Sequence, residues 1–324
     1  MPPTHARDTL KEFAKRARGQ RSPTHLDATA VEVFDAFAAA GVDALLLKGP
    51  ALARLLYKDG EHRAYSDVDL LVAPRDLAGD RRSLSRLGYT NASEPLGIDD
   101  VGGVVHAETW TASGHGSSEA AMVDLHWRLP GSQAPAQVAW DALVARRTDV
   151  EVGGRHVPVL DRVGLALHLA THVAQHGTGY PQPLEDLALG LERWPEQVWR
   201  EAEDLARQIQ ALDAFAAGLR LVPPGAALAE ELGLPATDEL EWAILHRDER
   251  PRGTFHLQAF AEARSLAERA DALRRALLPT RAWIRWQHPW ASAGGAWLIA
   301  AYGLHLMRAP VWAARAWRFR RRAR

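Results

Sequence analysis

The sequence predicts an α/β protein whose first half carries the strands and whose second half is helical. Short apolar runs alternate with turns and helical segments up to about residue 160, and strand patterns fade after Asp161. A chain of 324 residues can hold two domains. We therefore predict an α/β domain over 1–160 and a mostly helical domain over 161–324, which ends in a tail rich in Trp and Arg.

The composition is that of an ordinary globular protein, with 47% hydrophobic and 24% charged residues. A formal net charge of −1 gives no overall attraction to nucleic acid or membrane, and the lack of cysteine excludes disulfides, thiolate zinc sites and a cysteine nucleophile. The longest apolar stretch, 291–307, is interrupted and falls short of the roughly 20 residues of a spanning helix. The charged N-terminus lacks the apolar core of a signal peptide. We expect a cytoplasmic enzyme or binding protein without stable membrane insertion.

The first half of the α/β part alternates helices with strands. Apolar residues at helical spacing predict helices over 4–18 and about 28–40. Two short apolar runs then predict two strands with a helix between them. A further helix follows the second strand, and a glycine marks its end. These predicted elements are a strand at 43–47, a helix at about 50–57, a strand at 66–72 and a helix at 77–87.

Extended runs continue as far as a small hairpin, after which only helical patterns follow. The runs at 104–110 and 121–129 predict an antiparallel pair that continues the sheet, and a Gly-Gly turn predicts a hairpin over 150–159. A proline at 279 ends the helical series. The predicted helices lie at about 161–176, 183–193, 196–222, 225–233, 237–247 and 256–277.

Three carboxylates stand on the predicted strands. Asp67 and Asp69 are at the start of the run Val68–Val72, and residues two apart on a strand point to the same face. Asp124 lies within another apolar run, Met122 to Trp127. A buried carboxylate costs several kcal/mol unless it is paired or bound to a metal. Three such acids on neighbouring strands would share two Mg²⁺ ions, the arrangement that supports in-line phosphoryl chemistry. The alternative for the Asp-x-Asp pair alone is a solvated strand edge.

The three acids follow a Lys-Gly turn in the sequence. The motifs, in chain order, are Leu47-Lys48-Gly49, Tyr57, Arg63, Ser66-Asp67-x-Asp69-Leu70-Leu71-Val72 and Val123-Asp124-Leu125-His126-Trp127. Together they resemble the uncharacterised nucleotidyltransferase family within the DNA polymerase β-like superfamily. The resemblance covers residues 25–190 and implies a small mixed sheet flanked by helices, a glycine turn that grips the phosphates of an NTP, and three aspartates that hold two Mg²⁺ ions, with Mn²⁺ as an alternative. One departure is Pro50, which stands where superfamily members commonly have serine.

The resemblance assigns catalytic roles to the aspartates and a nucleotide-binding role to the turn. Asp67 and Asp69 would bridge both cations, and Asp124 would bind the cation that activates the acceptor hydroxyl. Gly49 lets backbone N–H groups approach a phosphate, and the helix that starts near Pro50 presents its positive end. The alternative reading of these two residues is a plain strand-to-helix turn.

Further residues are candidates for contact with the nucleotide. Lys48 and Arg63 could neutralise the leaving pyrophosphate, although Arg63 fits a surface ion pair equally well. Ser66 is assigned to the nucleotide by the resemblance. His126 shares a strand face with Asp124 and could touch the nucleotide or the acceptor. Its alternative is a histidine hydrogen-bonded inside the sheet.

Two other features carry possible chemistry. His168, His172 and His176 recur every four residues on one predicted helix face, a spacing at which imidazoles can share a zinc ion. No carboxylate completes an H-E-x-x-H pattern, which argues against a zinc site. The family resemblance implies similar histidines in this helical region together with an acid like Asp186, so we expect His172 and Asp186 to form a structural or site-lining pair. The six arginines of 314–324 could bind an anionic surface, with a frayed, solvated terminus as the favoured alternative. We expect the tryptophans of the tail to be core anchors.

These observations predict a magnesium-dependent nucleotidyltransferase that moves an NMP from an NTP such as ATP to an acceptor with a hydroxyl group. The acceptor could be a small molecule, a peptide or protein, or RNA. One alternative is a non-catalytic nucleotide-binding or regulatory protein on the same fold. Another is a tailoring transferase that uses an activated phosphate or a sugar nucleotide as its donor.

Overall fold

The protein falls into two compact units; of the described residues, those up to 236 belong to the first and those from 257 onward to the second. The computed structural model describes residues 23–91, 107–112, 122–236, 257, 260, 265–279, 281, 284–285 and 288–322. The helices predicted over 4–18 and 237–247 lie outside these residues. The domain boundary predicted at residue 160 stays a prediction.

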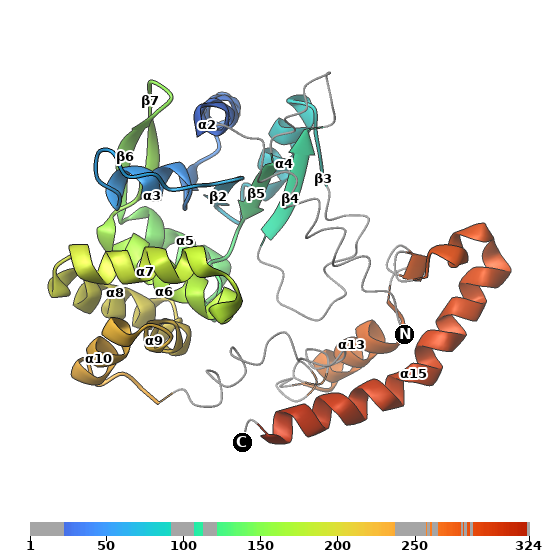
Figure 1. Cartoon of the computed structure of the whole chain (residues 1–324). Coiled ribbons are helices and arrows are strands. Elements are labelled where there is room, and N and C mark those ends of the chain that lie inside the picture. The colour runs from blue at the N-terminus through green and yellow to red at the C-terminus, as the bar shows by residue number, and fades with distance from the viewer. Residues whose placement is uncertain are drawn as a thin grey trace. The chain divides into compact units, whose positions relative to one another are not determined.

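The first unit is built on a mixed sheet. Its strands are β1 (Ala44–Leu46), β2 (Val68–Val72), β3 (Tyr89–Asn91), β4 (Ala107–Ala112), β5 (Met122–His126), β6 (Arg147–Val152) and β7 (Arg155–Leu160). These seven strands follow the order β3-β4-β5-β2-β1-β7-β6 (Figure 1). At the centre, β1 pairs antiparallel with β2 and parallel with β7, and β2 pairs parallel with β5. The remaining pairs are antiparallel.

Apolar side chains cover both faces of this sheet, because the central strands alternate between two cores. Leu46 and Leu70 face the α2-side core, together with side chains of α2 (Pro23–Ala39) and α4 (Leu77–Arg86). Leu45 and Leu71 face the α6-side core. The short helix α3 (Pro50–Leu55) contributes to both. The α6-side core is completed by α5 (Ala136–Val144), α6 (Arg162–His176), α7 (Pro181–Arg193), α8 (Glu196–Gln208), α9 (Leu212–Arg220) and α10 (Pro223–Glu231).

The sequence located most of these elements. The predicted strands at 43–47 and 66–72, the extended pair and the hairpin are confirmed within a few residues. The strand β3 and the helix α5 were not predicted. The helix is short, and its buried face consists of Ala139, Trp140, Ala142 and Leu143. Elements of this length give too little periodicity to be distinguished from loops.

The single helix predicted over 196–222 is wrong, because the chain turns between α8 and α9. Gln210 has a φ of 54°, and the N–H of Ala211 bonds to the carbonyl of Ala206 over 2.7 Å, which closes α8 in the manner of a Schellman motif. The carbonyls of Ile209 and Gln210 accept hydrogen bonds from the backbone of 133–134. A distant loop therefore stabilises the break. Gly218 of α9 sits against the backbone of α6, where an added Cβ would meet the Ala170 carbonyl oxygen at 1.9 Å.

The second unit contains α13 (Leu266–Leu277), the 3₁₀ turn η5 (Pro289–Ala293) and the long helix α15 (Gly295–Arg322). The helix α13 agrees with the described part of the helix predicted over 256–277. None of the helices described for the chain is long and apolar enough to cross a membrane.

Five of the six arginines of 314–324 lie on α15, which corrects the expectation of a frayed terminus for the described residues. Arg324 lies outside the described residues. The helix contains Pro310, which is why a helix across the tail was not predicted. Trp290, Trp297 and Trp317 are 41%, 56% and 52% exposed, so these tryptophans are not the core anchors that we expected. Trp283 and Trp286 lie outside the described residues. Contact of the arginines with an anionic surface stays a prediction.

Candidate functional site

Asp69 and Asp124 face each other across two neighbouring parallel strands. The pairing of β2 with β5 sets Asp69 opposite Asp124 and Leu71 opposite His126. Because side chains alternate along a strand, both aspartates and His126 project from the face that carries Leu71. That face belongs to the α6-side core, and Asp69 is only 1% exposed there. The register of two apolar strands thus brings the second and third predicted acids together.

Lys48 supplies a positive charge to these acids. It stands two residues after β1, and its Nζ lies 3.0 Å from Oδ1 of Asp69. The Nε2 atom of His126 lies 3.3 Å from the same oxygen. Burial alone would raise the pKa of the Asp69 carboxyl, but Lys48 and His126 together hold that pKa below its usual range. Although burial opposes it, the surrounding aspartates raise the pKa of Lys48. This lysine and Asp69 therefore form a charged pair at neutral pH.

The other two acids respond differently to the same surroundings. Burial, followed by the charge of Asp69, raises the pKa of Asp67 to about 6. The same two causes raise the pKa of Asp124, although a hydrogen bond with Thr109 of the neighbouring strand opposes the shift. Close carboxylates repel each other, so the charged forms of Asp67 and Asp124 are disfavoured beside the ionised Asp69. The cluster therefore has too little positive charge to favour the ionised form of all three acids.

The donor set of this cluster is suited to a metal ion. Asp69, Asp124 and His126 each offer a ligand atom within 4.8 Å of the other two. Oδ2 of Asp69 and Oδ1 of Asp124 are buried and have no hydrogen-bond partner among the described residues. Buried polar atoms normally find a partner, and carboxylate oxygens are the ligands that hard divalent cations take. The residues present thus fit the divalent cation that the sequence predicts.

The Lys48-Gly49-Pro50 turn runs beside this cluster. Gly49 has a φ of 62° and a ψ of −113°, which is a conformation that side chains disfavour. A Cβ at this position would lie 3.5 Å from the carbonyl oxygen of Asp67, so the turn passes close to the first acid. Ser66, just before that acid, is half-buried. The turn and the acids are neighbours, and contact of Gly49 and Ser66 with a nucleotide stays a prediction.

Arg63 lies in a buried ion pair with Asp186 of α7. Its Nη2 is 2.7 Å from Oδ2 of Asp186, and its Nε is 3.0 Å from Oδ1. Tyr57 donates a hydrogen bond of 2.7 Å to the same carboxylate, and Gln182 also bonds to it. The pair is buried, so the alternative of a surface ion pair for Arg63 is corrected to a buried one. Asp186 binds Arg63, not His172 as we expected, and the proposed contact of Arg63 with pyrophosphate remains a prediction.

The histidines of α6 form a row of neighbouring rings, in which His168 stacks on His172 and His172 meets His176 edge to face. The ring centroids of His168 and His172 are 5.4 Å apart, and those of His172 and His176 are 4.4 Å apart. Burial, followed by the charge of Lys48, lowers the pKa of His168 to about 3 and that of His172 well below its ordinary value. Among the described side chains, the three histidines do not form a metal-ligand group. The spacing of four residues was the signal for this row, and the fold places its first member near Lys48.

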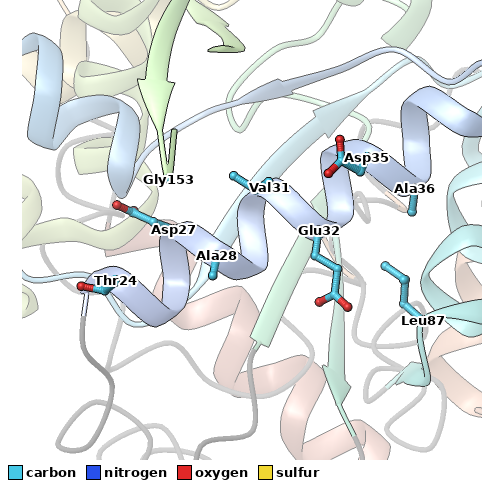
Figure 2. Close-up of a pocket in the computed structure, with 9 residues that line it drawn as sticks. All are labelled: Thr24, Asp27, Ala28, Val31, Glu32, Asp35, Ala36, Leu87 and Gly153. Carbon is cyan, nitrogen blue, oxygen red and sulfur yellow. The ribbon is translucent and has the colours of Figure 1, made fainter. Parts of the chain in front are cut away.

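A pocket of about 810 Å³ lies elsewhere, along the outer side of α2 (Figure 2). Its lining includes Asp27, Glu32 and Asp35, and no residue of the acidic cluster. Two of these acids are already paired. Asp27 binds Arg54 and Tyr65 over 2.6 and 2.9 Å, and Asp35 binds an arginine of β7. The pocket therefore lacks the converging, unpartnered ligand atoms that mark the cluster around Asp69.

Comparison with known proteins gives a family and distant structural neighbours. One solved structure that the chain resembles is a solution structure of the antibiotic-resistance factor ANT(2'')-Ia, with 13% identity, a TM-score of 0.42 and coverage of 59% of this chain and 97% of that one. Another is an antigenic nucleotidyltransferase-like protein from Paracoccidioides brasiliensis, with 12% identity, a TM-score of 0.35 and coverage of 69% and 96%. No curated protein matches the sequence. The model of a family described as uncharacterised nucleotidyltransferase matches residues 1–223, and the chain therefore belongs to that family.

Proposed function

We propose that the protein transfers an NMP from an NTP to an acceptor with a hydroxyl group, using divalent cations held by Asp67, Asp69 and Asp124. The observation that carries this proposal is the pairing of Asp69 with Asp124, each with a buried oxygen that lacks a hydrogen-bond partner among the described residues. Membership of a nucleotidyltransferase family supports the reaction type. Carboxylates on adjacent strands can hold the pair of divalent cations that supports in-line transfer to phosphorus.

The residues around the cluster would divide the work of the transfer. In the reaction, the acceptor oxygen forms a bond to the α-phosphorus, and the bond to the bridging oxygen breaks to release pyrophosphate. Bound cations would supply positive charge to the phosphates and acidify the acceptor hydroxyl. Lys48 is charged and 18% exposed, so it can bind a phosphate oxygen while it contacts Asp69. The Gly49 turn offers backbone N–H groups without a side chain in the way.

The connection between α3 and β2, which leads to Asp67, is held in place by contacts outside the acidic cluster. Tyr57 and Arg63 lie in this connection, and both bind Asp186 of α7. Glu61 between them is bound by Arg193 of the same helix. These contacts tie the connection between α3 and β2 to the helical layer. Arg63 and Tyr57 are therefore positioning residues for Asp67, which follows a few positions later.

The proposal is tested by incubating the protein with each NTP, Mg²⁺ or Mn²⁺ and a panel of hydroxyl acceptors, and measuring pyrophosphate release. Asp69→Asn removes a metal ligand, which should lower turnover more than the loss of a residue that only orients a ligand. We therefore expect turnover to fall at least about 100-fold. Asp80→Asn is the matched control, since Asp80 is an equally buried aspartate on α4. It should leave turnover unchanged.

Three outcomes would contradict parts of this proposal. Undiminished turnover in Asp69→Asn would exclude the cluster as the reaction centre. Binding of an NTP, measured by calorimetry, without pyrophosphate release for any acceptor would favour a non-catalytic nucleotide-binding protein instead. Release of a group other than pyrophosphate from a sugar nucleotide would favour a tailoring transferase.

A further inference from the structure

We propose that His126 is a metal ligand, and that the site it forms with Asp69 and Asp124 binds a first-row transition metal such as Mn²⁺ in preference to Mg²⁺. The proposal rests on the same cluster as the proposed function, but it concerns which residues bind the cation and which cation they select. It departs from the set of three aspartates that the family resemblance implies.

The sheet places these three side chains as one group. Asp124 and His126 are two residues apart on β5, and Asp69 stands opposite Asp124 on the parallel strand β2. All three project from the same face of the sheet. Each offers one ligand atom, and these atoms lie within 4.8 Å of one another. Three ligands held by two adjacent strands are rigid, because their spacing is fixed by backbone pairing.

The unpartnered oxygens point to a ligand independently of that spacing. Asp69 is 1% exposed, and its Oδ1 lies 3.0 Å from Nζ of Lys48 and 3.3 Å from Nε2 of His126. Its Oδ2 is buried without a hydrogen-bond partner in the described part of the chain, as is Oδ1 of Asp124. An unsatisfied buried acceptor costs about 1–3 kcal/mol, and more when it is charged. A cation at these two oxygens removes that cost while Lys48 keeps its own contact.

Asp67 does not belong to this group. Among the residues that the structure describes, Asp69, Asp124 and His126 are the only set of three that brings ligand atoms so close together. Asp67 precedes β2 by one residue and is only half-buried. The cation nearest the sheet would therefore have two carboxylates and one imidazole as ligands. Asp67 would lie outside this ligand set.

An imidazole in the ligand set changes which metal is favoured. Mg²⁺ binds oxygen ligands in near-ideal octahedral geometry and keeps several waters, so a buried imidazole adds little to the affinity of the site for Mg²⁺. Imidazole suits later first-row metals, whose affinity for sites with nitrogen ligands rises along the series that begins with Mn²⁺. Three protein ligands with a remaining open position are also the pattern of catalytic metal sites. The donor set thus favours a transition metal over Mg²⁺.

The test measures metal binding without any substrate. Protein freed of metal by a chelator and then desalted is titrated separately with MnCl₂ and MgCl₂ by calorimetry. We expect Mn²⁺ to bind at least about 10-fold more tightly than Mg²⁺, and His126→Gln to lower Mn²⁺ affinity by about 10-fold or more with a smaller effect on Mg²⁺. Pulsed electron paramagnetic resonance of the Mn²⁺ complex should show coupling to a coordinated nitrogen, which His126→Gln removes.

His168→Gln is the matched control, because His168 is a buried histidine near the cluster but outside the ligand group. It should retain both Mn²⁺ affinity and the nitrogen coupling. Loss of affinity in His168→Gln equal to that in His126→Gln would indicate a general disturbance of the site and would overturn the assignment. Absence of nitrogen coupling in the unmodified protein, or equal affinity for the two metals, would also overturn it.

The proposal and the transfer function fail separately. Nitrogen coupling from His126 without pyrophosphate release would leave the metal site intact and remove only the transfer function. Pyrophosphate release that is supported equally by both metals, with no nitrogen coupling, would leave the transfer function intact and remove His126 from the ligand set.

Discussion

The two sides of the sheet hold buried carboxylates in opposite states. On the α6 side, Asp69 lies against Lys48, and Asp186 lies against Arg63. On the α2 side, Asp80 of α4 is fully buried, and its oxygens have no hydrogen-bond partner from another residue in the described part of the chain. Burial raises the pKa of Asp80 to about 8, whereas Lys48 keeps that of Asp69 low.

This difference teaches that burial alone does not mark a functional acid. Asp80 is mostly protonated at neutral pH, so it brings little charge to a ligand. Asp69 remains charged because a cation lies beside it, and that cation comes from a turn on the neighbouring strand. Substitutions that change one side of the sheet at a time test this contrast, from the largest expected effect to the smallest.

Removing the cation beside Asp69 should affect turnover most. Lys48→Met leaves the carboxylates without a positive partner and takes away a phosphate ligand, so we expect kcat/KM to fall about 100-fold or more. Lys48→Arg keeps the charge and should recover part of the loss. The measurement is pyrophosphate release at saturating Mn²⁺. Equal activity of Lys48→Met and the unmodified protein would show that the lysine is only structural.

Breaking the buried pair at Asp186 should affect stability most. Arg63→Leu leaves the Asp186 carboxylate buried without its cation, and removing one partner of such a pair typically costs about 3–5 kcal/mol. The double variant Arg63→Leu with Asp186→Leu removes both charges and should recover much of the loss. Urea denaturation of the three proteins gives the comparison. A double variant no more stable than Arg63→Leu would argue against the charge as the cause.

The α2 side should respond to pH in the manner of an unpartnered acid. Because the pKa of Asp80 is raised to about 8 on folding, its contribution to stability is full below the unfolded pKa and is lost as pH rises toward 8. Asp80→Asn removes this titration. The Tm of Asp80→Asn relative to the unmodified protein should therefore rise between about pH 5 and pH 8. A Tm difference that is independent of pH would place the cause elsewhere.

The exposed pair that ties the same segment to α7 should matter least. Arg193 bonds to Glu61 over 2.6 Å, and this hydrogen bond holds the pKa of Glu61 to about 2. The pair lies at the surface, where water and salt weaken it. Glu61→Gln should change Tm only slightly at low salt and not at all at high salt. A loss of stability as large as that in Arg63→Leu would contradict the role given to burial.

The sequence anticipated the parts of the site that depend on local pattern. The apolar runs Val68–Val72 and Met122–His126 are confirmed as strands, and alternation along them puts Asp124 and His126 on one face. The Lys48-Gly49 turn was recognisable because a glycine and a proline end one element and begin another. Such features need only a few neighbouring residues, so a single sequence contains them.

Tertiary structure decided the choices that join residues far apart in the chain. Arg63 was equally suited to a phosphate or a carboxylate, and it pairs with Asp186, 123 positions away, because α7 packs over the segment. The break at Gln210 depends on a loop that binds the carbonyls there. The register of β2 against β5 brought His126 to Asp69, which no local spacing could fix. Local sequence thus determined which side chains share a strand face, and packing of distant elements determined which partners they meet.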